Sequence, residues 1–392
     1  MNYVEDIVKE KYDYYTNKNY LKAKELSVIT VPKGFALPVK KRYNPNKSLC
    51  GTGGITNSDG EYLKESAMLG YNMSNRLLGG YSFNKENVPY IDESVIYINH
   101  FIHQWGHYLI DVINRLWYIL DKNIQELKFV YIVREGDNDR IAGNYLEILE
   151  LLGIKESNIY RINKVTQFKE IIIPEASIYP GKYYTSEYKK IFDTIIKNAN
   201  IKIDPQKTIY CSRGKFKKSS KKEIGEKVIE ESFNDNGFES VYFEKMSVKE
   251  QIQLINNSKI IVSISGTLPH NIVFSRGNTK FIILNKTYKL NMHQFILDQV
   301  SGRKVDFVDV NVSPLPVEYG RGPFIIKITN CLKNYFIDNN FTLNKRVNYK
   351  LSLKEKMWFY IRYIINNRLR KVKDSDFDLK IIRNNYMRTQ KQ

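Results

Sequence analysis

Short apolar, strand-like segments alternate with longer amphipathic, helix-like segments from residue 94 onward. Parallel strands need a crossover of about a dozen residues or more, which is usually a helix, so this alternation predicts parallel sheets covered by helices. The pattern closes with a helix near residue 199 and then repeats, so we expect an α/β fold of two βαβ domains facing a cleft. The expected strands are 95–98, 128–133, 170–173, 208–211, 240–243, 259–264 and 280–284, and the expected helices are 104–120, 141–152, 186–199, 222–233 and 247–256.

A chain of 392 residues is long enough for two or three domains. We assign residues 1–200 to an N-terminal α/β domain, 201–330 to a C-terminal α/β domain and 331–392 to a basic helical extension. The segment 313–323 is rich in Pro and Gly, which predicts a linker or a shaped loop. Arg321 in this segment is therefore a candidate for the cleft.

The balance of charge is unusual, because 61 Lys and Arg face 42 Asp and Glu, a net charge of +19. About half of the excess lies in residues 345–392, which hold 14 basic and four acidic residues. A basic excess of this size indicates a polyanionic partner: nucleic acid, an anionic membrane surface or phosphorylated substrates.

The compartment is predicted from three further features. No stretch approaches the roughly 18 uninterrupted apolar residues of a membrane span. The N-terminus lacks the basic and then apolar segments of a secretory signal. The three cysteines lie far apart, and an odd, sparse set fits a reducing compartment. The expected location is cytoplasmic.

Three of the five histidines fall between positions 100 and 107, directly after a predicted strand. If a helix follows, every fourth residue shares one face, opposite an apolar stripe. An aspartate one turn after a histidine accepts a hydrogen bond from its ring N–H and fixes its tautomer. His107 with Asp111 is therefore a candidate general base that deprotonates a hydroxyl nucleophile. The predicted face carries His103, His107, Asp111 and Arg115.

This histidine pattern has other interpretations. It also fits a solvated helix face, or a histidine that only caps the helix. A His-x-x-x-His metal site lacks a clear third ligand here, so we expect no metal. The nearest approach to an Asp-x-Asp motif, residues 137–139, is predicted to be a turn.

A basic stretch follows the predicted strand 208–211. Arg213 offers a planar fork of donors for phosphate oxygens, and Lys215 offers a mobile point charge. Together they are candidates for holding a diphosphate at the mouth of the cleft. A solvated basic loop is the alternative.

A glycine turn follows the predicted strand 259–264 and leads into a short helix near Pro269. Exposed N–H groups at a helix N-terminus attract anions. The turn therefore provides further candidates for contact with a phosphate or a sugar, namely Ser265, Gly266, Thr267, His270 and Asn271.

Taken in order and spacing, these stretches resemble glycosyltransferase family 61, especially its bacterial capsular and cell-surface polysaccharide members. The family's aromatic-Gly-His-aromatic-Leu-x-Asp helix, which ends in Arg-Leu-Trp, matches residues 105–117. Its strand ending in Ser-Arg matches residues 212–213, and its Ser-x-x-Glu-Gln helix matches 247–251. The likeness covers about residues 90–290. Many members carry His-Gly-Ala-Gly-Leu at the last turn, whereas this chain has Ser-Gly-Thr-Leu at 265–268 and a later His270.

The resemblance implies an inverting, metal-independent transferase of GT-B type, with two Rossmann-like domains. The donor would be a nucleotide sugar, with a UDP-sugar expected, and no cofactor would be needed besides this substrate. The second domain would hold the nucleotide diphosphate, and the first would present a hydroxyl of a growing surface glycan, such as capsule or lipopolysaccharide. Arg213, Lys215 and the turn at Gly266 would stabilise the charge of the departing diphosphate.

The basic C-terminal region interleaves aromatic and aliphatic residues with Arg and Lys from residue 358 to 371. This pattern predicts an amphipathic helix on anionic lipid, which would place the enzyme at the inner face of the plasma membrane, near lipid-linked glycan acceptors. The alternative is a helix that packs back on the first domain.

Two other classes of function fit part of the sequence. A nucleic-acid-binding protein would account for the charge but not for the histidine cluster, and no zinc-finger, RRM or KH signature is present. Another glycan-modifying transferase, such as a phospho- or pyruvyl-transferase, is the second alternative.

Overall fold

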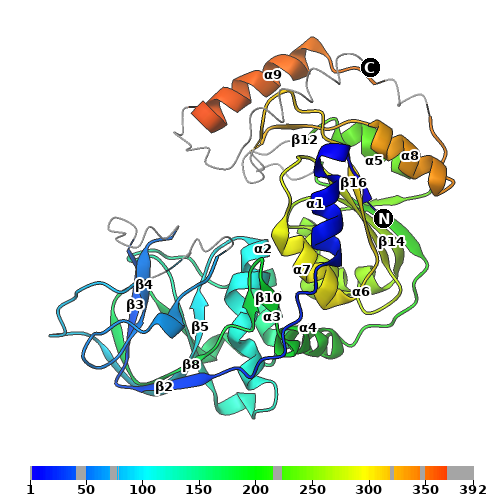
Figure 1. Ribbon diagram of the computed structural model, residues 1–392. Coiled ribbons are helices and arrows are strands. Elements are labelled where there is room, and N and C mark those ends of the chain that lie inside the picture. Colours follow the sequence, from blue (N-terminus) through cyan, green and yellow to red (C-terminus); the bar gives the residue numbers. More distant parts are fainter. Residues whose placement is uncertain are drawn as a thin grey trace.

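The computed structural model describes residues 2–40, 50–70, 77, 79–214, 223–317, 322–344 and 349–368. Two separate sheets, both associated with helices, give the α/β fold that the alternation predicts (Figure 1). One sheet is formed by strands between residues 28 and 174, and the other by strands between 207 and 309 together with the first residues of the chain. Helices α2, α3 and α4 lie on the side of the first sheet that faces α6 and α7 (Figure 1).

The first sheet is mixed, with the strand order β4-β3-β8-β5-β6-β7, and β2 also pairs with β8. Its parallel part, β8-β5-β6-β7, contains the strands that the sequence predicts in this half. The antiparallel part comes from the first 56 residues, which show little periodicity. The strands are β2 (Val28–Pro32), β3 (Phe35–Lys40), β4 (Thr52–Thr56), β5 (Tyr90–His100), β6 (Lys128–Ile132), β7 (Ile159–Ile162) and β8 (Thr166–Pro174).

The segment after β5 differs from the regular helix expected over 104–120. It consists of α2 (Trp105–His107), the π-helix η3 (Tyr108–Val112) and the 3₁₀-helix η4 (Ile113–Ile119), end to end. Its predicted apolar face is confirmed, because Leu109, Val112 and Leu116 are fully buried. The next two helices of this half, α3 (Asn144–Leu151) and α4 (Ser186–Ala199), fall where the sequence predicts them.

The second sheet is entirely parallel, with the order β13-β11-β14-β15-β16-β1. After the first half, the chain enters this sheet at β11 and moves outward to β13. It then crosses to the other side of β11 and adds β14, β15 and β16. The carboxyl ends of β11 and β14 therefore flank a topological switch point, where ligands bind in open parallel sheets. The strands are β1 (Asn2–Tyr3), β11 (Lys207–Cys211), β13 (Glu239–Val241), β14 (Ser258–Ile264), β15 (Lys280–Asn285) and β16 (Val305–Asp309).

The helices of this half are α5 (Glu226–Asn234), α6 (Val248–Asn256), α7 (Met292–Ser301) and α8 (Asn330–Asp338). The predicted capping box of α6 is confirmed, because Ser247 Oγ accepts from Glu250 N while the Glu250 side chain accepts from Ser247 N. Glu147 of α3 also accepts hydrogen bonds from two N–H groups of the first turn of α6, at 2.7 and 2.9 Å. A carboxylate is favourable at a helix N-terminus, so these bonds join the two halves.

The first residues of the chain lie against the second sheet. β1 pairs in parallel with β16, and α1 (Asp6–Asn17) follows it. Tyr12 of α1 is buried, with its ring centroid 5.6 Å from that of Phe295 on α7 and 5.1 Å from that of Phe307 on β16.

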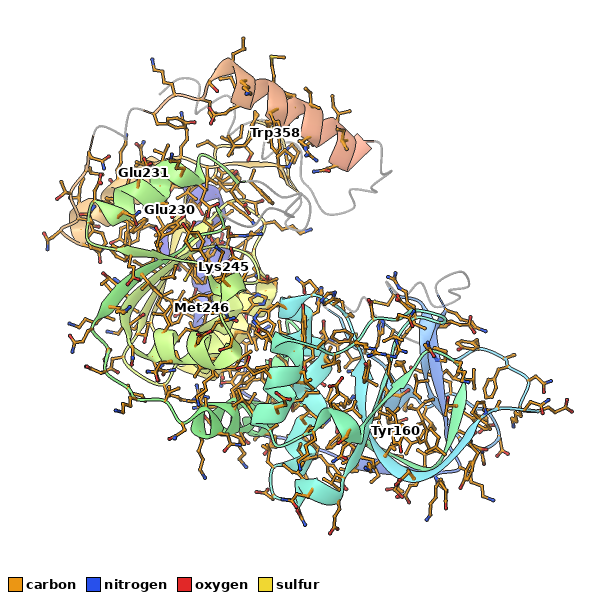
Figure 2. All side chains as sticks on the ribbon, turned by 180° about the vertical axis from the view of Figure 1, so that it is seen from behind. Tyr160, Glu230, Glu231, Lys245, Met246 and Trp358 are labelled. Atoms are coloured by element: carbon orange, nitrogen blue, oxygen red, sulfur yellow. The ribbon has the colours of Figure 1, made fainter. Side chains whose placement is uncertain are left out.

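The C-terminal helix α9 (Leu353–Tyr363) continues into the π-helix η10 (Ile364–Arg368). Its buried Phe359 packs on a short parallel pair, β12 (Glu223–Ile224) and β17 (Phe324–Ile325). The expectation that a packed helix would contact the first domain is wrong, because β12 and β17 lie in the second half. Viewed from behind, Trp358 of α9 lies at the same end of the molecule as Glu230 and Glu231 of α5, far from Tyr160 in the first sheet (Figure 2).

The remaining elements are short. Among the described residues, none of the helices combines the length and apolar character needed to cross a membrane. The short elements are β9 (Ile178–Tyr179), β10 (Tyr183–Tyr184) and the 3₁₀-helices η1 (Lys64–Ser66), η5 (Ile124–Glu126), η6 (Glu156–Asn158), η7 (Phe243–Lys245) and η8 (Pro269–Phe274).

Candidate active site

His107 and Asp111 form the contact that their spacing predicts. His107 Nδ1 lies 2.8 Å from Asp111 Oδ2, the Asp111 side chain is fully buried, and the His107 side chain is 25% exposed. Gln104 fixes the start of this segment, because its Oε1 accepts a hydrogen bond from the His107 backbone N–H at 2.8 Å. With Nδ1–H donating to the carboxylate, Nε2 is the nitrogen left to accept a proton.

The other two members of the predicted face lie elsewhere. His103 precedes α2, is exposed, and makes an edge contact with Tyr145 at a centroid distance of 5.2 Å. Arg115 is fully buried, and its guanidinium donates to the carbonyl oxygens of Glu65, Ala67 and Pro174. The placement of Arg115 in the cleft is wrong, because the π- and 3₁₀-helical turns break the four-residue repeat beyond His107. Arg115 instead joins the backbone of residues 65–67 to the end of β8 in the first sheet. His103 lies before the first helical turn and so outside the repeat, and its place in the cleft stays a prediction.

Gly106 packs directly against residues of the second half. A Cβ built on it would lie 2.8 Å from both His270 Nδ1 and Thr267 Cγ2, so a larger residue does not fit without movement. Beside it, Trp105 Nε1 donates to Asn271 Oδ1 at 2.6 Å, and Asn271 Nδ2 donates to Gln251 Oε1 at 2.9 Å. Asn271 therefore joins the two halves, and its amide is already bonded at both ends.

We predict that Gly106→Ala separates these surfaces. The added methyl group overpacks a buried contact, which we expect to cost about 1–3 kcal/mol and to lower the midpoint of thermal unfolding. Gly277→Ala is the matched control, because the nearest atom to its new Cβ, the Asn256 carbonyl oxygen, would be 3.8 Å away. An unchanged midpoint for Gly106→Ala would contradict the close packing of His270 against α2.

Three histidines from different elements gather beside this contact. The ring centroid of His293, on α7, lies 6.5 Å from that of His107 and 6.4 Å from that of His270. Burial and the two other imidazoles hold the pKa of His270 well below its ordinary value, so His270 is neutral at pH 7. It is therefore a hydrogen-bonding group rather than a cation for a phosphate.

Asn291 connects His270 to the glycine turn. Its Nδ2 donates to His270 Nε2 at 3.1 Å and to the Gly266 carbonyl oxygen at 3.3 Å. The polar groups thus run without a break from the histidines to the carboxyl end of β14.

Two cations meet at the glycine turn. Arg213 follows β11 and Lys286 follows β15, so they flank the turn that follows β14. A Cβ built on Gly266 would lie 3.7 Å from Arg213 Nη1 and 3.8 Å from Lys286 Nζ. Both cations bind one carboxylate oxygen, Glu223 Oε1, at 2.8 and 2.6 Å. The Lys286 side chain is 1% exposed and that of Arg213 is 20% exposed.

A second carboxylate lies behind this pair. Glu226 Oε1 accepts from the Arg213 backbone N–H at 3.0 Å. Burial, together with the neighbouring Glu223, raises the pKa of Glu226 to about 7. Burial alone would also raise the pKa of Glu223, but Lys286 and Arg213 outweigh it and lower that pKa. Near neutral pH, Glu226 is therefore partly protonated.

The remaining candidates differ in how they are placed. Ser265 Oγ accepts from Lys286 N at 3.2 Å, so it helps to position the lysine. Thr267 is half-buried next to Gly106. Lys215 and Arg321 lie outside the described residues. The triplet at 137–139 directly follows a turn at 135–136, and Asp137 Oδ1 accepts from the next two backbone N–H groups.

Residues 105–282, which begin at Trp105 and end within β15, match the sequence model of the family described as Glycosyltransferase 61. This segment is a glycosyltransferase family 61 domain. No curated protein matches the sequence. The match supports glycosyltransferase activity, and it includes His107, Asp111, Arg213 and Gly266.

Several residues of this family 61 site are absent from the sequence-based prediction. Lys286 and Asn291 lie just beyond the matched range, and nothing in the local sequence separates Lys286 from other lysines. Glu223 and Glu226 read as ordinary positions of a predicted helix. His293 is the one of these with a usable signal, because it is the fifth histidine of a histidine-poor chain.

Proposed function

We propose that this protein is an inverting glycosyltransferase of GT-B type, which moves a sugar from a nucleotide-sugar donor to a hydroxyl of a surface glycan. The observation that carries the proposal is the meeting of Arg213 and Lys286 at Gly266, beyond the carboxyl ends of three neighbouring parallel strands. Phosphate groups bind at such positions in α/β sheets. Residues 201–330 would hold the donor, 1–200 would present the acceptor, and 331–392 would form a basic extension.

The diphosphate of the donor would lie beside the two cations. Burial keeps water away from Lys286, so its charge acts more strongly on a bound phosphate than that of a surface lysine. Glu223 now satisfies both cations and holds them at the turn. Lys215 is proposed to add a further positive charge from the same loop as Arg213.

The proposed reaction is a single displacement. The acceptor oxygen bonds to the anomeric carbon while His107 Nε2 takes the hydroxyl proton. The bond from that carbon to the diphosphate oxygen breaks, and the electron pair leaves with the diphosphate. Attack opposite the leaving group inverts the anomeric configuration. Asp111 stabilises the imidazolium that forms, because it accepts from Nδ1–H.

Fixed protein groups would neutralise the leaving group without a metal ion. Arg213 and Lys286 lie at the turn before the reaction, so little reorganisation accompanies the development of charge. A UDP-sugar as donor, and a capsule or lipopolysaccharide glycan as acceptor, are proposed from the family resemblance.

Thermal unfolding with a panel of nucleotide sugars tests the proposal. A ligand that binds only the native state stabilises it by about 2.7 kcal/mol at 100 times its Kd, so at least one UDP-sugar should raise the midpoint by a few degrees. EDTA should not remove this shift, and uridine, which lacks phosphate, should not produce it. Stabilisation by nucleic acid, with none by any nucleotide sugar, would contradict the proposal.

A further inference from the structure

Helix α9 and the turn that continues it present two different apolar faces. One face packs on the second half: Phe359 is buried against Ile224 and Phe324, and Trp358 and Tyr363 are partly buried beside it. This face accounts for the attachment of the helix. Within the part of the chain that the structure describes, the side chains of the other face are exposed.

The second face is a stripe of exposed apolar side chains. Its positions follow the spacing i, i+4, i+7, i+8, i+11 and i+12, so they lie along one side of the helix. Six of the twelve large apolar side chains that are exposed in the described residues belong to this one segment, and the other six are spread over residues 14–337. A contiguous exposed patch of this kind marks an interaction surface. The stripe consists of Leu353, Met357, Tyr360, Ile361, Ile364 and Ile365, which are 74%, 56%, 45%, 55%, 46% and 38% exposed.

Positive charge surrounds the stripe. Lys354 and Lys356 are exposed on the same helix. Burial and the nearby charges of Lys356 and Lys350 lower the pKa of Lys327, so these lysines lie close enough to repel one another. In sequence, residues 345–392 carry 14 basic and four acidic residues. The surroundings of the stripe therefore favour an anionic partner.

We propose that the stripe of α9 docks on the surface of an anionic lipid membrane, with the helix lying in the plane of the interface. Aliphatic side chains would enter the boundary between headgroups and acyl chains, while the lysines contact the headgroup phosphates. A second copy of this chain would bring two basic surfaces together, and a nucleic acid would leave the aliphatic side chains without a partner. The anionic lipid surface is the partner that satisfies both the charge and the apolar stripe.

Docking would also fix the orientation of the candidate active site. Phe359 packs on Ile224, and the adjacent residue Glu223 holds Arg213 and Lys286. The membrane contact and the cation cluster are therefore joined through β12. An acceptor attached to lipid would meet the protein at the end that carries this cluster.

Vesicle flotation of the full chain tests this proposal. We expect the protein to bind phosphatidylcholine vesicles that contain phosphatidylglycerol, and to bind pure phosphatidylcholine vesicles much more weakly. The triple variant Met357→Ser, Ile361→Ser and Ile364→Ser should lose at least about ten-fold in vesicle affinity, because it removes apolar insertion and keeps every charge. Its unfolding midpoint should stay unchanged, since these side chains are exposed.

A matched control replaces exposed apolar residues elsewhere. Tyr14→Ser, Ile203→Ser and Ile337→Ser change side chains that are 61%, 53% and 61% exposed, and this variant should bind vesicles like the parent protein. The proposal would be overturned if both variants lost vesicle affinity equally, or if the parent protein did not bind anionic vesicles. A dimer that the stripe variant abolishes, without vesicle binding by the parent, would assign the stripe to a second copy and would also overturn it.

Discussion

Replacing His107 by glutamine is expected to lower the rate of sugar transfer by about 10²–10⁴-fold, the usual contribution of a positioned general base. Glutamine retains a hydrogen-bonding group near Asp111 but has no nitrogen that accepts a proton at neutral pH. The donor should still bind, because the cation cluster is unchanged. The measurement is kcat for transfer, together with the donor-induced rise of the unfolding midpoint.

His103→Gln is the control for this change. His103 is exposed, precedes α2 and contacts Tyr145 rather than Asp111, so its replacement should leave kcat nearly unchanged. A His107→Gln enzyme with full activity would exclude His107 as the base. In that case His293, the neighbouring histidine at 6.5 Å, would become the first residue to examine.

Arg213→Gln is expected to reduce kcat by about 10²–10³-fold, comparable to the loss of one preorganised donor at a developing charge. It should also weaken donor binding, so the shift of the unfolding midpoint with a UDP-sugar should shrink. Lys286 remains bound to Glu223 in this variant, which keeps the buried carboxylate paired. Steady-state kinetics at varied donor concentration separates the loss of kcat from the weaker binding of the donor.

Arg276→Gln is a matched control for Arg213→Gln. Both arginine side chains are 20% exposed and both bind a carboxylate, Asp193 in the case of Arg276. Arg276 lies in the loop after η8, so its loss should lower stability without changing kcat. Equal kinetic losses in the two variants would show that Arg213 acts on the fold and not on the leaving group.

The regular part of the fold could be predicted from local patterns. The helix α4 and the strands β11, β14 and β15 are found within a residue or two of their expected limits, since each is continuous in its periodicity. The capping box of α6 was equally clear, because Ser247 and Glu250 carry both hydrogen bonds themselves. These elements need no distant partner to be recognised.

The segment after β5 shows where local reasoning failed. A four-residue repeat predicts a regular helix, but a wider turn followed by a tighter one is found, and it places Arg115 on the buried carbonyls of Glu65, Ala67 and Pro174. His107 and Asp111 still meet, although Asp111 already lies in the π-helical turn. The antiparallel strands β2 and β3 were missed for a related reason, since their partner β8 is more than 100 residues away in sequence, and β4 joins the sheet only through β3.

Some residues of the candidate site could be predicted from the sequence, but the contacts between them could not. Arg213 and Gly266 follow buried strands, which is a signal in the sequence. The meeting of Lys286 with Arg213 on Glu223 depends on the order of strands in the sheet, and no spacing in the sequence encodes that order. The same holds for Asn291, which reaches both His270 and Gly266 from the start of α7.

The pairing of β1 with β16 has a consequence for how the molecule is made. β1 is synthesised about 300 residues before the strand with which it pairs. Until β16 has been made, β1 and α1 have no sheet on which to pack. Assembly of the second sheet is therefore completed when this early segment adds to its edge, and closing so long a loop makes this a late step.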